Sequence, residues 1–337
     1  MKPAATILTI AFLVLLNAQI TAAQPKVSIL HVVIGPKQVP LWIAHEQGLF
    51  AKHGIDVHLG LFDPRLPGHR QLSSDSPFGA LGLPVAIAGA TEGRDVKLLV
   101  AFNSAGAATA HLVTAPGIKT ADDLRGKRFG TNRIGTGFWV AAILALEHLG
   151  LDPLRDRISF VEIGGGGLPL VQALEAGKID AVVLDPAQGA VLKAKGFSLV
   201  LDMSATSIPG VQDALAVAGP YLRAHPDVVA KVVAGLVEGI AFSLSPRNKE
   251  VVLKTLMGRL NISTAAAAEV AYQEVLARVT LKPYVSVAVA QRYQRALAVN
   301  DPKVLSVKVE ELLDERFVRQ LDENGAMDRL YDSYGLK

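Results

Sequence analysis

The chain has 337 residues, half of them hydrophobic and 19% charged, and it contains no cysteine. This composition excludes a disordered or collagen-like chain, and the lack of cysteine excludes disulfides, thiolate metal sites and cysteine nucleophiles. The formal charge of +3, from 34 basic and 31 acidic residues, is too small and too scattered to indicate binding to nucleic acid. At about 150 residues per domain, the length predicts two domains.

The first 23 residues are typical of a secretory signal peptide. Lys2 gives a positively charged start, an apolar stretch runs from Ala4 to Leu16, and small residues lead up to Ala23. We expect cleavage after Ala23, which leaves an exported, freely diffusing protein in the periplasm. The alternative is an uncleaved N-terminal anchor, although the apolar stretch is short for a membrane span.

Short apolar runs and helical patterns alternate after the signal segment. Strands are predicted at 27–33, 55–61 and 96–102, and helices at 38–52 and 84–91. The order strand, helix, strand, helix, strand favours a mostly parallel sheet covered by helices.

A second series of strands and helices begins near residue 110. It contains predicted strands at 110–114, 128–131, 158–163, 179–184 and 197–201, with helices between them. The two series predict two sheets, joined by chain crossings near 103–108 and 203–211.

From Pro220 onward the pattern changes to long helices. These are predicted at about 221–244, 247–258, 264–279, 286–299 and 308–323. We expect them to pack back on the first sheet.

The loop after the predicted strand 128–131 is the strongest candidate for ligand binding. In open α/β sheets, ligands bind at the carboxyl ends of the strands. Thr136 and Gly137 begin a helix, whose free N–H groups and partial positive charge suit an anion. Arg133 can pair with a carboxylate, sulfonate or phosphate, and Phe138 can form an apolar wall. The alternatives are that Thr136 only caps the helix, Arg133 only lies at the surface and Phe138 is core.

Two other loops follow predicted strands. Gly164 and Gly165 allow the backbone to approach a ligand closely, or they form a flexible turn. Asp185 can bind an amine or hydroxyl, or it is a turn or N-cap aspartate. The eight histidines are dispersed, so we expect no metal site. The pattern indicates no catalytic residue and no cofactor, which favours a binding protein over an enzyme.

Residues 40–57, PLWIAHEQGLFAKHGIDV, resemble a family motif: P-hydrophobic-W-hydrophobic-A-x-E-x-G-L-F-x-K-x-G-hydrophobic-D-V. It is the opening motif of periplasmic solute-binding proteins of ABC transporters, in the nitrate, sulfonate and taurine (SsuA-like) branch. Residues 118–127 and 174–181 also match, in the family's order, so the resemblance covers about residues 27–203.

This resemblance implies a type II-like periplasmic-binding-protein fold, with two α/β lobes that close on a small ligand. Each lobe is expected to hold a mostly parallel sheet flanked by helices. Lobe 1 is expected to comprise 24–105 plus 210–337, including the helical C-terminal region, and lobe 2 to comprise 106–209. By position, the family's cleft residues fall on Gln38, Phe78, Asn103, Thr136, Gly137, Phe138, Gly164, Gly165 and Asp185.

The expected function is capture of a small ligand and its delivery to an ABC permease in the inner membrane. The ligand is expected to be anionic, like a sulfonate, nitrate or carboxylate, or an aromatic organic molecule, and the protein is expected to be a monomer. The alternatives are a secreted enzyme on the same two-lobe scaffold and a ligand-loaded sensor that signals to a membrane receptor.

Overall fold

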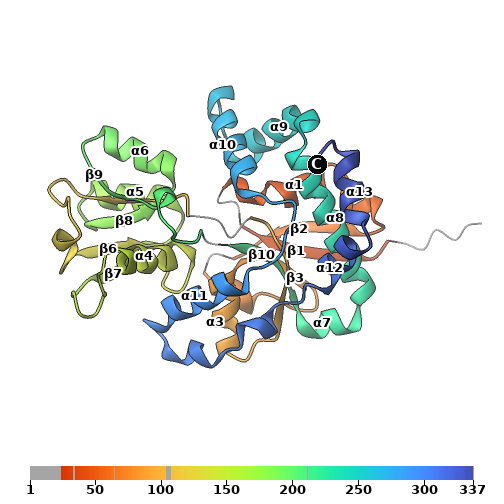
Figure 1. The fold of residues 1–337 in the computed structure, drawn as a ribbon, viewed down its shortest axis with the longest axis horizontal. Helices are drawn as coiled ribbons and strands as arrows, with labels where there is room; N and C mark the ends of the chain where they lie inside the picture. Colours follow the sequence, from red (N-terminus) through yellow and green to blue (C-terminus); the bar gives the residue numbers. More distant parts are fainter. Residues whose placement is uncertain (1–23, 33–34, 64, 104–107, 211, 337) are drawn as a thin grey trace, which may run out of the picture.

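The computed structural model describes residues 24–32, 35–63, 65–103, 108–210 and 212–336 (Figure 1). The predicted signal peptide and its cleavage site lie outside these ranges. Over the described ranges, no single helix is long and apolar enough to cross a membrane. One pair of helices, 226–244 and 246–260, meets the length and composition criteria together but is bent by 81°.

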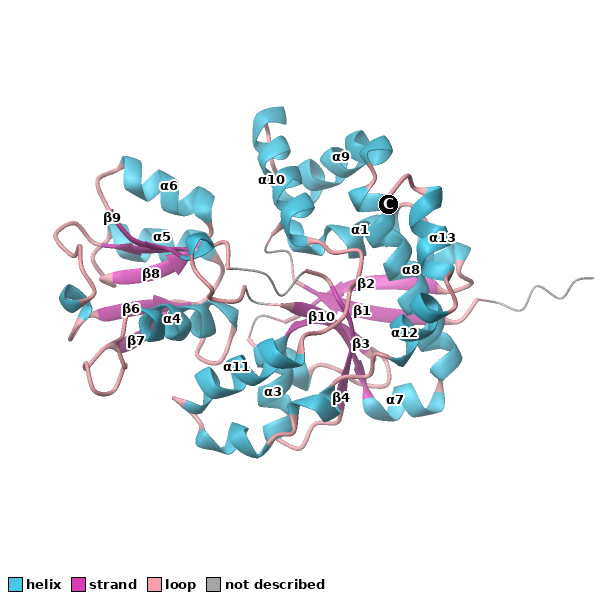
Figure 2. Cartoon of the chain, in the orientation of Figure 1, coloured by secondary structure: helices cyan, strands magenta, loops and turns pink. Residues whose placement is uncertain are grey.

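The first of two five-stranded sheets has the strand order β2-β1-β3-β10-β4 (Figure 2). Strands β1 to β4 all run in one direction, and β10 is antiparallel to both of its neighbours, β3 and β4. The strands are β1 (Lys26–His31), β2 (Asp56–Leu61), β3 (Phe78–Gly82), β4 (Val96–Ala101) and β10 (Asp213–Ala218).

The second sheet has the order β7-β6-β8-β5-β9, and here β5 is the reversed strand. In both sheets the reversed strand is the first one that the chain forms after it arrives from the other sheet. The predicted pair of mostly parallel sheets is therefore confirmed, with one antiparallel strand in each. The strands are β5 (His111–Thr114), β6 (Arg128–Thr131), β7 (Ser159–Glu162), β8 (Ala181–Leu184) and β9 (Ser198–Asp202).

Helices cover both sheets, and the C-terminal ones surround the first sheet (Figure 1). The helices before β10 are α1 (Val39–Glu46), α2 (Leu49–Lys52), α3 (Leu83–Thr91), α4 (Gly137–His148), α5 (Gly167–Glu175) and α6 (Pro186–Ala194). Those after it are α7 (Gly219–Ala224), α8 (Pro226–Leu244), α9 (Lys249–Leu260), α10 (Ala265–Arg278), α11 (Val287–Ala298), α12 (Arg316–Glu323) and α13 (Ala326–Ser333).

The structure corrects several predicted elements. The single helix expected over 38–52 is divided between α1 and α2, because Gly48 adopts a left-handed φ of 66°. The helix expected over 221–244 breaks at His225, since the residue before a proline disfavours helical geometry. The helix expected over 308–323 is a short 3-10 turn at Val309–Leu312 followed by α12. Strands β3 and β10 and helix α13 were not predicted.

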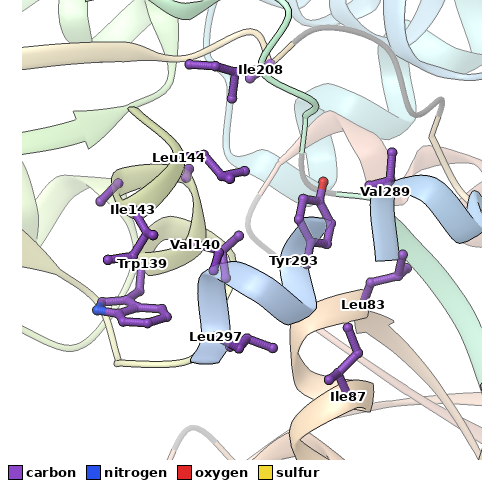
Figure 3. Close-up of a cluster of buried hydrophobic side chains, with 14 of the residues drawn as sticks. Leu83, Ile87, Trp139, Val140, Ile143, Leu144, Ile208, Val289, Tyr293 and Leu297 are labelled. Carbon is purple, nitrogen blue, oxygen red and sulfur yellow. The ribbon is translucent and has the colours of Figure 1, made fainter. Parts of the chain in front are cut away.

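One apolar cluster joins helices from both halves of the molecule. Helix α4, which follows β6 of the second sheet, packs against α3 and α11. Val140 of α4, Ile87 of α3 and Leu297 of α11 all belong to this buried cluster (Figure 3). The C-terminal helix α11 therefore contributes to the packing between the two halves.

Candidate functional site

Two segments connect the sheets, and backbone hydrogen bonds hold them side by side. Phe102 N donates to Asp213 O at 2.8 Å, and Asp213 N donates to the side-chain Oδ1 of Asn103 at 2.8 Å. On the side of the second sheet, Ala108 N donates to Ile208 O at 2.7 Å. The two crossings are therefore paired next to each sheet.

Buried side chains anchor the second crossing to the C-terminal helices. The amide of Gln212 donates to Asn103 O at 3.0 Å and to Tyr284 O at 3.3 Å, and it accepts from Ser286 N at 3.0 Å. The hydroxyl of Tyr293 accepts from Gln212 N at 3.2 Å and donates to Gly210 O. These bonds fix the end of the crossing that enters β10.

A cavity of about 370 Å³ lies between the two sheets at this crossing. Residues of β3 and of β8 both line it, so it belongs to neither sheet alone. Its polar lining consists of Lys37, Asp63, Asn103, Thr109, Asn132, Thr136, Asp185, Asp213 and Arg278. Its larger apolar lining side chains are Val32, Phe62, Leu66, Leu81, Val85, Phe138, Val183 and Leu184.

Half of the site residues that the sequence predicts are brought together by the fold. Five of them line the cavity, although they are up to 82 positions apart in the chain, from 103 to 185. They are Asn103, Thr136, Gly137, Phe138 and Asp185.

The other five predicted residues are not among those that line the cavity: Gln38, Phe78, Arg133, Gly164 and Gly165. Phe78 is fully buried and packs edge-on against Tyr221, with ring centroids 5.6 Å apart. Gly164 and Gly165 have φ angles of 76° and 65°, which favour glycine. A ligand-binding role for these five residues stays a prediction.

Gln38 is buried beside the site without a hydrogen-bond partner for either atom of its amide. The preceding residue, Lys37, lines the cavity. A buried amide without partners destabilises a fold by about 1–3 kcal/mol per group. Gln38 therefore offers two neutral N–H donors and a neutral carbonyl acceptor beside a residue that lines the cavity.

The start of α4 forms part of the cavity wall. The hydroxyl of Thr136 lies 2.6 Å from Asn132 Oδ1 and 2.7 Å from Arg133 O and donates its one proton to either oxygen, and it does not cap the helix. The alternative role as a helix cap is therefore wrong for the side chain of Thr136. The N–H groups at the start of α4 are left for another acceptor.

Sequence reasoning missed four charged residues of the lining. Lys37 and Asp213 form an ion pair at 2.6 Å, with side chains only 17% and 7% exposed. Arg278, at the end of α10, lies 4.0 Å from Asp185 and 3.3 Å from Glu274. Asp63 binds Arg65, whose hydrogen bonds lower the pKa of that carboxyl to about 2.

The sequence near the residue pointed to the site for only one of these four residues. Lys37 neighbours the predicted Gln38, whereas Arg278 ends a helix in the C-terminal region, where no motif marks it. Within the described ranges, no group of three or more histidine, aspartate or glutamate side chains is placed to hold a metal ion.

Comparison with known proteins identifies the family. The model of the NMT1/THI5-like family matches residues 35–248, which is more than half of the chain. The chain belongs to the NMT1/THI5-like family. No curated protein matches its sequence.

Solved structures similar to this NMT1/THI5-like protein show its fold. A putative sulfonate-binding protein SsuA from Methylobacillus flagellatus KT has a TM-score of 0.69 and 17% identity, covering 90% of this chain and 95% of its own. The periplasmic nitrate-binding protein NrtA from Synechocystis PCC 6803 has a TM-score of 0.68 and 12% identity, with coverages of 89% and 88%. The Candida albicans CA3427 gene product, described as having the generic periplasmic binding protein fold, has a TM-score of 0.66 and 15% identity, with coverages of 86% and 96%. The NMT1/THI5-like chain has this periplasmic-binding-protein fold, as its sequence predicts.

Proposed function

We propose that the protein is the periplasmic solute-binding component of an ABC importer. It is exported by removal of residues 1–23, binds a small organic molecule between its lobes as a monomer, and delivers it to a permease in the inner membrane. The observation that carries this proposal is the cavity of about 370 Å³ lined by both sheets. The names of the SsuA and NrtA structures, which describe sulfonate and nitrate binding, support it.

The chemistry of the lining suits reversible binding. Its polar groups are amides, hydroxyls and charges, and several of them, such as Lys37 with Asp213 and Thr136 with Asn132, already have partners in the protein. Such groups orient a ligand through hydrogen bonds, and the apolar side chains bury its body. Micromolar affinity needs only about 8 kcal/mol, which these contacts supply without covalent chemistry.

The connectivity suits closure of two lobes on the ligand. We propose that residues 24–105 plus 210–337 move against residues 106–209, with the two paired crossings as the hinge. A ligand that contacts both lobes stabilises the closed state because it binds that state more tightly than the open one.

Native mass spectrometry of the mature protein, incubated with a small-molecule extract of the organism that makes it, tests the proposal. We expect one bound small molecule per chain, released with unchanged mass on denaturation. Bound ligand should also raise the melting temperature, by the equivalent of about 2.7 kcal/mol at 100 times its Kd. Release of a converted product would identify an enzyme, and failure to retain any small molecule would contradict a binding protein.

Gly137→Val tests whether the cavity is the binding site. Gly137 is the first residue of α4 and lines the cavity, so an isopropyl group there fills space that the ligand needs. We expect affinity for the retained molecule to fall by about tenfold or more, or about 1.4 kcal/mol, with little change in stability.

Gly166→Val is the matched control, measured by the same calorimetric titration. Gly166 directly precedes α5, a helix on the second sheet, but it is not among the residues that line the cavity and has open space where a Cβ would stand. Equal affinities for the two variants would place the ligand elsewhere.

A further inference from the structure

The described lining of the cavity carries more negative than positive side chains. Its carboxylates are Asp63, Asp185 and Asp213, and its cations are Lys37 and Arg278. The lining therefore has a formal excess of one negative charge. An anionic ligand would enter a site that repels it, unless one of the two cations is available to neutralise it.

Both lining cations lie against carboxylates, although Arg278 Nε makes no hydrogen bond. Lys37 forms its ion pair with Asp213 at 2.6 Å, and burial of both side chains shields the pair from water. Arg278 donates to Thr109 O at 3.1 Å and lies between Glu274, at 3.3 Å, and Asp185, at 4.0 Å. Moving either cation to a ligand anion would leave a carboxylate without its partner, which is costly inside a protein.

Asp185 is the carboxylate with the most room to accept a hydrogen bond. Its side chain is 45% exposed, it does not cap α6, and its nearest cation, at 4.0 Å, lies beyond hydrogen-bond distance. By contrast, Asp213 is held by Lys37, and Arg65 binds both oxygens of Asp63. An N–H group of a ligand would find its acceptor at Asp185.

Besides the two cations, the start of α4 is a lining feature that favours negative charge. A helix N-terminus is equivalent to about half a positive charge, which is less than the negative excess of the lining side chains. Its free N–H groups bind a neutral carbonyl oxygen as well as an anion. The helix end therefore adds a place for a ligand acceptor without making the cavity attractive to anions.

Most of the remaining large side chains of the lining are apolar. Phe62, Leu66, Leu81 and Val85 come from the first half of the chain, and Phe138 faces the cavity from α4. These side chains suit the hydrocarbon or aromatic body of a ligand.

We infer that the ligand carries no net negative charge and has an N–H group, bound by Asp185, on an apolar body that lies against Phe138 and Leu81. The inference rests on the proposed binding function and narrows it. From the sequence, both an anionic ligand and an aromatic organic ligand were expected as alternatives. The lining of the cavity favours the aromatic organic ligand.

Four probes with one aromatic body test this inference: benzamide, benzylamine, benzoate and benzenesulfonate. Isothermal titration of the mature protein should show that benzamide and benzylamine bind at least about tenfold more tightly than the two anions. Tighter binding of benzoate or benzenesulfonate would overturn the inference and leave the proposed function standing. The inference would also be overturned if neither benzamide nor benzylamine bound. The proposed function is tested separately, by the native mass spectrometry described above.

Asp185→Asn tests whether Asp185 is the residue that binds the N–H group of the ligand. We expect the variant to bind benzylamine about tenfold more weakly and benzoate more tightly, because the lining loses a negative charge. Asp122→Asn is the control, since Asp122 is an exposed carboxylate of the second lobe that does not line the cavity. An unchanged ratio of benzylamine to benzoate affinity in Asp185→Asn would rule out Asp185 as the acceptor.

Discussion

Replacing Gly239 with alanine is expected to destabilise the protein by about 2–4 kcal/mol, although alanine favours helices more than glycine does. Gly239 lies in α8, where this helix crosses α1. A Cβ atom at this position would stand 2.4 Å from the carbonyl oxygen of Pro40 and 2.9 Å from the Cβ of Ala44. The nearer atom is backbone, so α8 and α1 must separate to make room.

Gly258→Ala is the matched control for Gly239→Ala. Gly258 is also a helical glycine, in α9, but it has open space where the Cβ would go. There we expect alanine to stabilise the protein by about 0.5–1 kcal/mol through helix propensity. Urea denaturation of both variants measures the two changes, and a shift of the same sign in both would contradict the close approach of α8 to α1.

The fold could be predicted from the sequence where local patterns agree with the tertiary structure. The helix at 137–148 follows from its glycine start and apolar run, and the strands before it from their short apolar runs. Strands β3 and β10 were missed because their sequences, FGALG and DALAVA, are rich in glycine and alanine instead of β-branched residues. Close packing explains why position 79 of β3 is glycine, because a Cβ atom there would lie within 2.9 Å of the side chains of Phe62 and Leu72.

The candidate site could be predicted only where strands end in recognisable loops. Thr136, Gly137 and Asp185 stand at such loops and line the cavity. Asp213 belongs to it because the chain crosses back into the first sheet, and Arg278 because the end of α10 reaches Thr109, just after the first crossing. Those contacts depend on the tertiary arrangement, which the sequence around each residue does not show.

A second large effect is expected from Glu238→Ala, which should destabilise the protein by about 3 kcal/mol. The Glu238 side chain, on α8, is only 1% exposed. Its carboxylate accepts hydrogen bonds from Lys52 at 2.5 Å and from Tyr334 at 2.8 Å, and it lies 2.7 Å from His53 Nε2. The substitution leaves Tyr334 and the partly buried His53 without their acceptor, whereas water can solvate Lys52, whose side chain is 62% exposed. Thermal and urea denaturation measure the loss, and Glu269→Ala, which breaks an exposed pair with Lys249, should leave stability almost unchanged.

The same carboxylate makes stability depend on pH. Burial raises the pKa of Glu238, but the hydrogen bonds from His53, Lys52 and Tyr334 outweigh it and lower the pKa from 4.5 to about 2. A carboxyl with a lowered pKa stabilises the folded state above its unfolded value, and this contribution is lost as the pH falls from 4.5 towards 2. The shift corresponds to about 3 kcal/mol. Glu238→Gln removes the titrating group, so urea unfolding near neutral pH and at about pH 3 should show a smaller loss of stability for this variant than for the wild type. If the wild type and Glu238→Gln lose equal stability at acid pH, protonation of Glu238 is not the cause, and other carboxylates account for the acid sensitivity.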